Sequence, residues 1–300
     1  MPEIPSITPI TAPRRPIHVG APDPQRVALD VYRALEEDIG EGDASAALMP
    51  SDLHGQAEVL AREELVLAGC AWFDGCMRAL DPQARIFWHF ADGERVAAGS
   101  VLCRIEAKAR ALLSGERSAL NFLQTLSGTA TATAACVAML AGSRTRLLDT
   151  RKTLPGLRYA QKYAVRAGGA ENHRLGLYDA ILLKENHIIA AGGIVAAIAA
   201  ARRQSPGLEV EIEVETLTEF RQALHARPDR IMLDELPPED LRSAIAERVA
   251  GVELELSGGV VRENLTELAE LGVDFISVGA LTKHVRAIDL SLRWRAHPCR

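Results

Sequence analysis

The chain has 300 residues, of which 48% are hydrophobic and 25% are charged, and its formal net charge is -6. These values are typical of a soluble globular protein that is long enough to bury a sizeable core. The acidic balance, with no basic stripe to offset it, disfavours a nucleic-acid-binding protein, although a local cationic pocket can still bind an anionic substrate.

The first 125 residues are predicted to form a tail and a domain of mixed helices and strands. Seven of the fifteen prolines lie within the first 24 residues, so residues 1–23 are expected to be an extended or disordered tail. In residues 24–125 the pattern predicts a helix at Gln25–Glu37 and strands at Ala57–Arg62, Leu65–Ala68, Arg85–Phe90 and Val101–Glu106. A long helix is predicted from Ser114 to Leu140, with Ser114 as its N-cap.

Residues 126–284 follow a different rhythm, in which short apolar strands alternate with helices. The predicted strands are Arg146–Asp149, Ala180–Leu183, Val210–Val214, Arg230–Leu233, Val252–Leu256 and Phe275–Val278. The predicted helices are Leu157–Ala167, Ile194–Gln204, Leu217–Ala226, Pro238–Val249 and Glu263–Leu271. This strict alternation predicts a parallel α/β sheet, either barrel-like or doubly wound. Residues 285–300 are expected to pack back on the N-terminal domain.

The five cysteines and the hydropathy pattern lead to expectations about location. The cysteines are scattered and form no C-x-x-C pair, so neither a disulfide framework nor a zinc site is expected. The longest apolar stretch, residues 194–201, is too short to cross a bilayer. The N-terminus has no apolar signal segment. We therefore expect a cytoplasmic protein without a membrane partner.

Charged residues or glycines stand at the end of every predicted strand of the second part. In chain order they are Thr150-Arg151-Lys152, Lys184-Glu185-Asn186-His187, Glu213 with Glu215, Asp234, Ser257-Gly258-Gly259 and Gly279-Ala280. Such residues after each strand are typical of the active site of a barrel, whereas a doubly wound sheet concentrates them at one switch point. The pattern therefore favours the barrel.

Four glutamates alternate with three aliphatic residues along the third of these strands, which reads Glu209-Val210-Glu211-Ile212-Glu213-Val214-Glu215. Because side chains alternate in direction along a strand, the four acids share one face. In a barrel the aliphatic face meets the helices, so the acids point inward, where they need cationic partners or a metal ion. We expect Arg151, Lys152 and Lys184 to be those partners. The alternative interpretation is a solvated edge strand.

Two further groups of residues predict an anion-binding site. Arg151, Lys152, His173, Arg174 and Lys184 form a cationic set around the first two strands, and such side chains suit carboxylates and phosphates. Ser257-Gly258-Gly259 and Gly279-Ala280 are typical of loops that bind phosphate through backbone N–H groups. These residues alone predict a site for a phosphorylated, multiply anionic small molecule, in which Glu213 and Asp234 hold Mg²⁺ or hydroxyl groups.

Several segments of the chain match the motifs of a known family in order. They are Gly115-Glu116-Arg117, the stretch from Leu148 to Arg158 around Thr150-Arg151-Lys152, His173-Arg174-Leu175-Gly176-Leu177-Tyr178-Asp179, Leu183-Lys184-Glu185-Asn186-His187, Ile231-Met232-Leu233-Asp234, Ser257-Gly258-Gly259 and Ile276 to Thr282. On these motifs the chain resembles the quinolinate phosphoribosyltransferase family over nearly its whole length. Two small departures are Glu235, where the family often has asparagine, and Ala170-Glu171, which interrupts a glycine run.

The resemblance implies a fold, a reaction and an assembly. The implied fold is an N-terminal α/β sandwich, over residues 24–125, followed by an incomplete parallel α/β barrel, over residues 126–284. The implied reaction converts quinolinate and phosphoribosyl pyrophosphate into nicotinate mononucleotide, pyrophosphate and CO₂, with Mg²⁺ as cofactor. The implied assembly is a homodimer in which Arg117 is contributed across the interface.

The resemblance also implies roles for individual residues. Arg117, Arg151 and Arg174 would bind the quinolinate carboxylates, and Thr150, His173, Lys152 and Lys184 would line the same site. Glu213 and Asp234 would hold the ribose hydroxyls and Mg²⁺. The 5′-phosphate would be bound by Ser257, Gly258, Gly259, Val278, Gly279 and Ala280. The catalytic residues would be Lys152, Lys184, Glu213 and Asp234.

Three alternative functions are compatible with parts of this pattern. A paralogue with the same fold would act on a different pyridine or ligand, but nicotinate would offer only one carboxylate to three arginines. An aldolase-type barrel would form a Schiff base at Lys184, although the surrounding arginines and acids favour anion binding instead. A non-catalytic binding protein is disfavoured because Glu213, Asp234 and Lys184 are all present.

Overall fold

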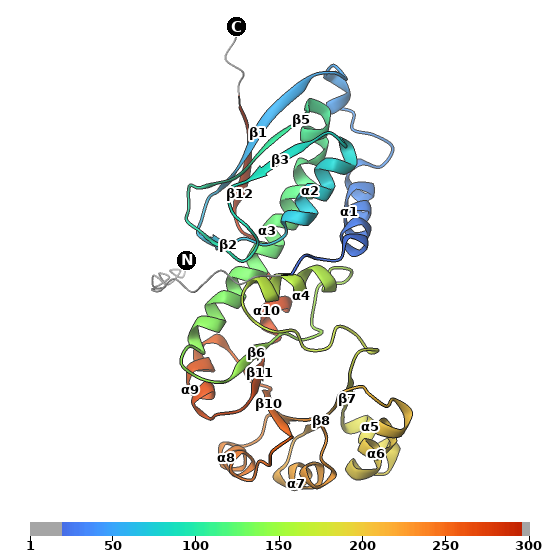
Figure 1. The fold of residues 1–300 in the computed structure, drawn as a ribbon, viewed down its shortest axis with the longest axis vertical. Helices are drawn as coiled ribbons and strands as arrows, with labels where there is room; N and C mark the ends of the chain where they lie inside the picture. Colours follow the sequence, from blue (N-terminus) through green and yellow to red (C-terminus); the bar gives the residue numbers. More distant parts are fainter. Residues whose placement is uncertain (1–19, 296–300) are drawn as a thin grey trace, which may run out of the picture.

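The computed structural model describes residues 20–295, and Figure 1 shows two parts connected by a long helix. The N-terminal part lies at the top of the view and the sheet of the second part lies at the bottom. The expected tail at residues 1–23 falls almost entirely outside the described residues. No helix between residues 20 and 295 is both long and apolar enough to cross a membrane.

The N-terminal part is a four-stranded antiparallel sheet packed against helices, with the strand order β12-β1-β5-β3. Its elements are α1 (Pro24–Ile39), η1 (Ala46–Leu48), β1 (His54–Ala61), β2 (Leu65–Val66), α2 (Cys70–Leu80), β3 (Arg85–Trp88), β4 (Arg95–Val96), β5 (Val101–Lys108) and α3 (Ala109–Met139). The core lies between the sheet and α1–α3, and it contains Val59, Trp72, Phe73, Ile105 and Leu120. This arrangement confirms the expected sandwich.

Helix α3 differs from its prediction at its first residue. It starts at Ala109, immediately after β5, and not at Ser114. The residues between are Ala, Arg and Leu, which favour helix strongly, so the helix continues upstream of Ser114. The Ser114 hydroxyl caps nothing and instead donates to Asp43 Oδ2 at 2.8 Å. The expected domain boundary between residues 125 and 126 lies within this one helix.

Four elements of this part, η1, α2, β4 and β12, were not predicted. Helix α2 buries Trp72, Phe73, Cys76 and Met77, and this i, i+1, i+4, i+5 spacing is that of an amphipathic helix. Strand β12 (Leu290–Arg295) follows the second part in the chain but pairs antiparallel with β1, from Ala61↔Leu290 to Gln56↔Arg295. The end of the described chain is thereby held in the sheet of the N-terminal part.

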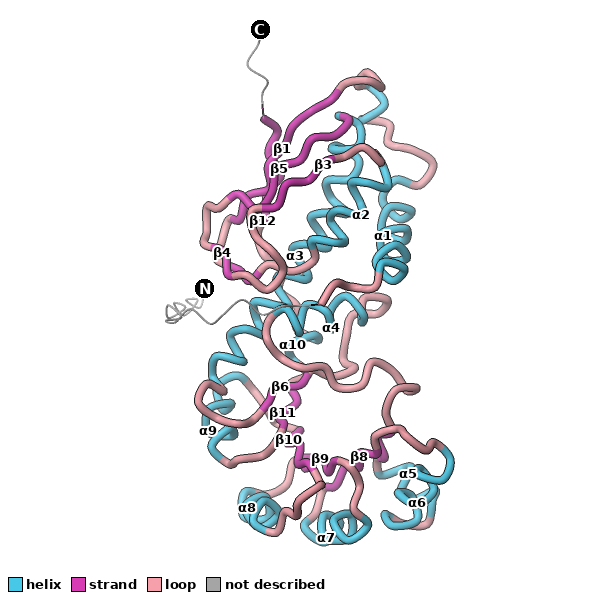
Figure 2. The backbone as a smooth tube through the Cα atoms, in the orientation of Figure 1, coloured by secondary structure: helices cyan, strands magenta, loops and turns pink. Residues whose placement is uncertain are grey.

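The second part is a six-stranded sheet with the order β6-β11-β10-β9-β8-β7, in which every pairing is parallel. The strands are β6 (Arg146–Leu148), β7 (Ile181–Leu183), β8 (Val210–Val214), β9 (Arg230–Asp234), β10 (Glu253–Ser257) and β11 (Phe275–Ser277). Each lies within one residue of its predicted bounds. Figure 2 shows these strands along an arc with helices outside it. Strands β6 and β7 are the two edges of the sheet, so the barrel is incomplete and the prediction is confirmed.

The helices of this part are α4 (Arg158–Ala167), α5 (Glu185–Ala191), α6 (Ile194–Gln204), α7 (Leu217–Ala226), α8 (Pro238–Ala246), η2 (Arg262–Asn264), α9 (Leu265–Glu270) and α10 (Ala280–Lys283). Helices α5 to α9 cover the outside of the arc, whereas α4 and α10 lie between β6 and the N-terminal part (Figure 2). The aliphatic residues Val210, Ile212 and Val214 of β8 belong to the core shared with these helices. Since side chains alternate along a strand, Glu211 and Glu213 face the inside of the arc. Strand β8 lies between β7 and β9, so it is not a solvated edge strand.

Candidate active site

The carboxyl ends of β6 and β11 bring two of the predicted segments together. A Cβ atom built on Gly279 would lie 3.0 Å from Lys152 Cδ and 3.5 Å from Thr150 Oγ1. The Thr282 hydroxyl also donates to the Lys152 carbonyl at 2.9 Å. A larger residue at position 279 would therefore shift the Lys152 side chain by a few tenths of an ångström. The predicted phosphate loop after β11 lies directly against the cationic segment after β6.

An acidic group lies at the carboxyl ends of β8 and β9. Carboxylate oxygens of Glu213, Glu215 and Asp234 all lie within 4.8 Å of one another. The Lys184 ammonium forms an ion pair with Glu213. Three clustered carboxylates with a single lysine partner keep a net negative charge, so this group suits a divalent cation.

The loop after β10 contacts this acidic group through its glycines. Ser257 is in register with Asp234 on the neighbouring strand. A Cβ atom on Gly258 would overlap Glu235 Cγ and lie 2.9 Å from Asp234 Oδ1, and Gly258 has φ of +77°. Glu235 itself has φ of +53°, a region in which asparagine is better tolerated than glutamate. Asparagine, which the family often has at this position, would therefore suit this backbone better than Glu235.

Two arginines lie together beside the opening between β6 and β7. Burial, followed by the charge of nearby Arg151, lowers the pKa of Arg174. Arg174 Nη1 donates to the Ala180 carbonyl at 3.4 Å, and Arg151 Nε is buried without a hydrogen-bond partner in the described chain. Two half-buried guanidinium groups that repel each other suit an anionic ligand that is placed between them.

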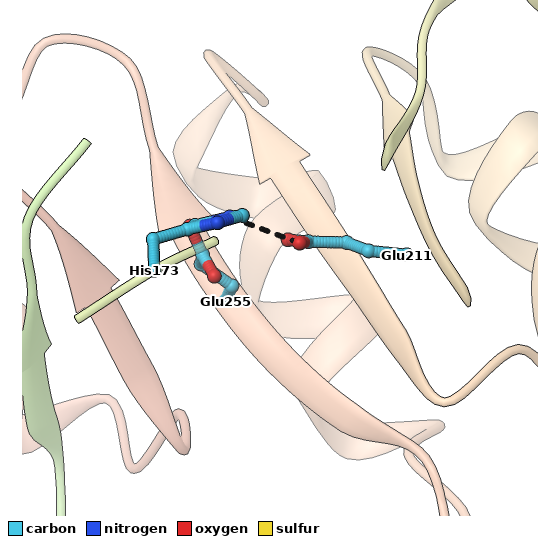
Figure 3. Close-up of side chains that lie close together, drawn as sticks. All are labelled: His173, Glu211 and Glu255. Atoms are coloured by element: carbon cyan, nitrogen blue, oxygen red, sulfur yellow. Dashed lines mark ion pairs between the residues drawn. The ribbon is translucent and has the colours of Figure 1, made fainter. Parts of the chain in front are cut away.

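His173 precedes Arg174 but points into the barrel, toward Glu211 and Glu255 (Figure 3). Its Nε2 lies 2.9 Å from Glu211 Oε2 and 3.7 Å from Glu255 Oε1. Its backbone is fixed from the other side, because Asp149 accepts the His173 N–H at 2.9 Å and Lys162 donates to the His173 carbonyl at 2.7 Å. The structure therefore places His173 deeper than the cationic residues around it.

The buried charges around His173 have shifted pKa values. Burial, and then the charge of Glu211, raises the pKa of Glu255 to about 8. Burial also raises the pKa of Glu211 to about 7, against the opposing effect of Arg230. Burial lowers the pKa of His173. The cluster therefore holds a neutral imidazole and a carboxyl proton near neutral pH.

The partners of the β8 glutamates differ from those expected. Lys184 does pair with Glu213, but the described residues contain no ion pair between this strand and Arg151 or Lys152. Arg230 takes their place, and its Nη2 lies 2.9 Å from Glu209 Oε1. The register of the sheet explains this difference, because it places Arg230, the first residue of β9, directly beside Glu211. The expectation about Arg151 and Lys152 was wrong.

Sequence reasoning missed four of the buried charged residues that support the site. Glu255 and Arg230 lie inside the barrel at 3.3 Å from each other, and Lys162 of α4 forms an ion pair with Asp149. The alternation Glu253-Leu254-Glu255-Leu256 repeats the pattern of β8 and was the available signal for Glu255. Lys162 gave no such signal, because one lysine on an amphipathic helix is ordinary.

Arg117 lies away from the other predicted residues. It is on the N-terminal part of α3, is half-exposed, and pairs with its neighbour Glu116 at 2.6 Å. The adjacent Ser118 donates to the Ala34 carbonyl of α1 at 3.4 Å, which places this turn of α3 in the N-terminal part. No ion pair in the described chain connects Arg117 to the barrel.

Comparisons with known proteins cover both parts of the chain. The family described as "Quinolinate phosphoribosyl transferase, N-terminal domain" matches residues 43–127, and the corresponding C-terminal domain matches residues 129–293. The chain is 41% identical over 257 residues to the probable nicotinate-nucleotide pyrophosphorylase (carboxylating) of Bacillus subtilis (strain 168), covering 85% of this chain and 89% of that one.

Two further relatives extend this similarity. The nicotinate-nucleotide pyrophosphorylase (carboxylating) of Mycobacterium leprae (strain TN) is 40% identical over 272 residues, covering 87% of this chain and 95% of the relative. The solved structure of the nicotinate-nucleotide pyrophosphorylase from Francisella tularensis superposes with a TM-score of 0.89 at 43% identity. That superposition covers 92% of this chain and 99% of the other.

Proposed function

The chain belongs to the quinolinate phosphoribosyltransferase family, and on this basis we propose that it converts quinolinate and phosphoribosyl pyrophosphate into nicotinate mononucleotide, pyrophosphate and CO₂ for NAD biosynthesis. The observation that supports this best is that Arg151 and Arg174 lie near enough to each other for the charge of Arg151, after burial, to lower the pKa of Arg174. Two adjacent guanidinium groups suit the two adjacent carboxylates of quinolinate. A monocarboxylate would leave one of them unpaired.

Phosphoribosyl pyrophosphate fits the other side of the site. The loops Ser257–Gly259 and Val278–Ala280 would hold the 5′-phosphate, and Gly258 has the positive φ that such a loop needs. The N–H of Val278 already donates to the Leu148 carbonyl at 2.9 Å, so the N–H groups of Gly279 and Ala280 are the donors that this second loop would offer. Lys152 and Lys184 provide point charges for the pyrophosphate. Glu213 and Asp234 face the position where the ribose hydroxyls would lie between these groups.

The chemistry follows from these charges. As pyrophosphate leaves the ribose, positive charge develops on the sugar and negative charge on the leaving group, and the lysines stabilise the latter. Attack by the ring nitrogen of quinolinate forms the new C–N bond. The C–C bond to the adjacent carboxylate then breaks and CO₂ leaves. The electron pair stays on the ring carbon, where the positive charge of the neighbouring nitrogen stabilises it until it takes up a proton from solvent. The arginines hold the ring in place through both steps, and no covalent nucleophile is needed.

Magnesium fits the acidic group at the ends of β8 and β9. Mg²⁺ prefers oxygen ligands and one or two carboxylates beside substrate phosphates, and Glu213, Glu215 and Asp234 converge within 4.8 Å. We propose that Glu213 and Asp234 bind the ion, directly or through water, and that Glu215 is a third candidate ligand. When bound, the ion would neutralise charge on the pyrophosphate.

A homodimer in the cytoplasm is also part of the proposal. Arg117 matches a family motif, yet it lies on α3 in the N-terminal part and pairs only with Glu116 in the described chain. We therefore propose that it completes the quinolinate site of a partner subunit.

The experiment that tests the function compares two pyridine carboxylates. Quinolinate should be converted to nicotinate mononucleotide in the presence of phosphoribosyl pyrophosphate and Mg²⁺, and nicotinate should scarcely react. The second carboxylate forms charge-assisted hydrogen bonds of about 1.5–3 kcal/mol, so kcat/KM should favour quinolinate by at least about tenfold. Comparable kcat/KM values for the two would instead support the paralogue with a different substrate.

A further inference from the structure

The cluster of His173, Glu211 and Glu255 lies inside the barrel and below its mouth (Figure 3). Glu211 precedes Glu213 by two residues on β8, and Glu255 precedes Ser257 by two residues on β10. All three side chains are at least nine-tenths buried. A strand residue and the one two positions later share a face, so the cluster forms the layer directly beneath the candidate active site.

Both ring nitrogens of His173 face groups of the protein itself. The backbone N–H of Arg174 donates to His173 Nδ1 at 2.7 Å, so Nδ1 is unprotonated and the ring proton is on Nε2. Nε2 faces the two acids, at 2.9 Å from Glu211 Oε2 and 3.7 Å from Glu255 Oε1. No nitrogen of this ring is left to contact a substrate.

The same arrangement disfavours a metal ion among the three residues, although their donor atoms all lie within 4.8 Å of one another. A metal needs an unprotonated nitrogen, and here the unprotonated nitrogen points at Arg174. Arg230 Nη1 also lies 3.3 Å from Glu255 Oε2, which supplies the cluster with a cation already. His173 Nε2, Glu211 Oε1 and Glu255 Oε1 are buried without well-aligned hydrogen-bond partners in the described chain, so the acids act on the ring through close approach and charge.

His173 thus connects the buried acids to a predicted substrate-binding residue. Its backbone is held by Asp149 and Lys162 on one side, and its ring is held between the acids on the other. The ring in turn accepts a hydrogen bond from the N–H of Arg174. This bond fixes the backbone from which the Arg174 side chain extends. Four rotatable bonds then separate this fixed backbone from the guanidinium.

We propose that Glu211 and Glu255 are positioning residues that act through the His173 ring to hold Arg174 in place for the substrate dicarboxylate. This inference rests on the proposed function, because it assigns Arg174 to quinolinate. It gives His173 a different role from that of an anion ligand. The acids do not contact the substrate themselves. Replacing them should therefore weaken the binding of the dicarboxylate and leave the binding of phosphoribosyl pyrophosphate unchanged.

The test replaces each acid with its uncharged isostere. In Glu255→Gln and Glu211→Gln, KM for quinolinate should rise about tenfold, which corresponds to about 1.4 kcal/mol. The kcat and KM for phosphoribosyl pyrophosphate should change by less than about twofold. The dissociation constant of phthalate, a dicarboxylate that lacks the ring nitrogen, should rise equally in calorimetry without turnover.

Glu253→Gln is the matched control. Glu253 lies on the same strand as Glu255 and also contacts Arg230, at 3.1 Å, but no contact with His173 exists in the described chain. This variant should keep the KM of the wild type for quinolinate. The ¹⁵N chemical shifts of His173 should also report an Nε2-protonated ring in the wild type and a changed ring environment only in the Glu211 and Glu255 variants.

Several results would overturn the proposal. An unchanged quinolinate KM in both acid variants would do so, and so would an equal loss for both substrates together with a falling melting temperature, which would indicate a structural role alone. Stoichiometric metal that disappears in His173→Gln would replace positioning with a metal site. If the wild type does not use quinolinate at all, the proposed function fails, and phthalate binding then still decides whether the acids position Arg174.

Discussion

Two lysines of this chain form ion pairs in opposite environments. Lys162 and Asp149 are both almost completely buried, at 1% and 0% side-chain exposure, and the pair also fixes the backbone of His173. Lys184 is 48% exposed beside Glu213. A buried pair stays paired because separating it would leave an uncompensated charge, whereas an exposed pair exchanges partners at little cost. Lys184 is therefore the lysine available to an incoming anion.

This difference leads to a prediction for Lys184 at the residue level. Lys184→Ala should lower kcat/KM by about ten- to a hundredfold, since charge-assisted hydrogen bonds contribute about 1.5–3 kcal/mol. Lys184→Arg should recover part of the loss because the charge survives while its geometry changes. Borohydride treatment with both substrates should add no mass to the protein. A reduced adduct located at Lys184 by mass spectrometry would support the aldolase interpretation instead.

Glu255 leads to a prediction about stability and pH. Its pKa is raised from 4.5 to about 8 in the folded protein, by burial first and then by Glu211. The folded state therefore retains a proton that the unfolded state releases, and the stabilisation from this proton is lost as the pH rises from about 4.5 to about 8. Glu255→Gln lacks this loss, so its melting temperature relative to the wild type should increase across that pH range. A difference that stays constant with pH would contradict this assignment.

At the level of elements, the loops after β10 and β11 depend on glycine for different reasons. Gly279 has an ordinary backbone but lies against Lys152 and Thr150. Gly258 has both a positive φ and a close neighbour, Asp234. The strands all end at the same edge of the sheet. The loops that follow β10 and β11 are therefore packed against the acidic residues that follow β8 and β9. Loop geometry and carboxylate position are thus coupled.

Gly258→Ala tests this coupling, with Gly272→Ala as its control. Gly272 has φ of +78°, close to the +77° of Gly258, but nothing lies within 4 Å of its Cβ position. Both variants should lose about 1–2 kcal/mol of stability from the positive φ. Only Gly258→Ala should displace Asp234 and Glu235, and it should raise KM for phosphoribosyl pyrophosphate about tenfold or more. Equal KM values in the two variants would mean that the loop does not set the position of Asp234.

At the level of the whole molecule, two features connect the N-terminal part and the barrel. Helix α3 begins in the first part and continues to β6 of the second, and β12 returns from the barrel to pair with β1. Figure 1 shows both connections side by side between the two parts. A double connection of this kind restricts rotation of one part against the other, so we expect no simple hinge motion that brings Arg117 to the barrel of its own chain.

Complementation tests whether Arg117 acts across a dimer. Arg117→Ala and Lys184→Ala homodimers should each keep at most about a tenth of the activity of the wild type, because every site lacks one group that contributes about 1.5–3 kcal/mol. After subunit exchange, half of the dimers of a two-fold assembly are hybrids, and one of the two sites in each hybrid is intact. Activity should therefore return to about a quarter of that of the wild type. If exchange is confirmed and no activity returns, Arg117 acts within its own chain.

The sequence by itself determined the order of the elements and the edge of the sheet that carries the chemistry. Apolar runs such as Val210–Val214 and their spacing depend on local periodicity, so all six barrel strands were predicted to within one residue. Motif segments such as Thr150-Arg151-Lys152 also identified the family. Helix α3 was misplaced at its start because a good N-cap residue, Ser114, competed with upstream residues that favour helix equally well.

Only the tertiary structure decided which charges meet. Arg230 replaced the expected partners of the β8 glutamates because parallel register places it beside Glu211, and register is a property of two strands that neither sequence specifies alone. The direction of the His173 ring depends on Asp149, Lys162 and Glu255, which come from three separate elements. Electrostatic pairing in a buried interior depends on distances of a few ångströms, and such distances arise only when segments far apart in the chain are packed together.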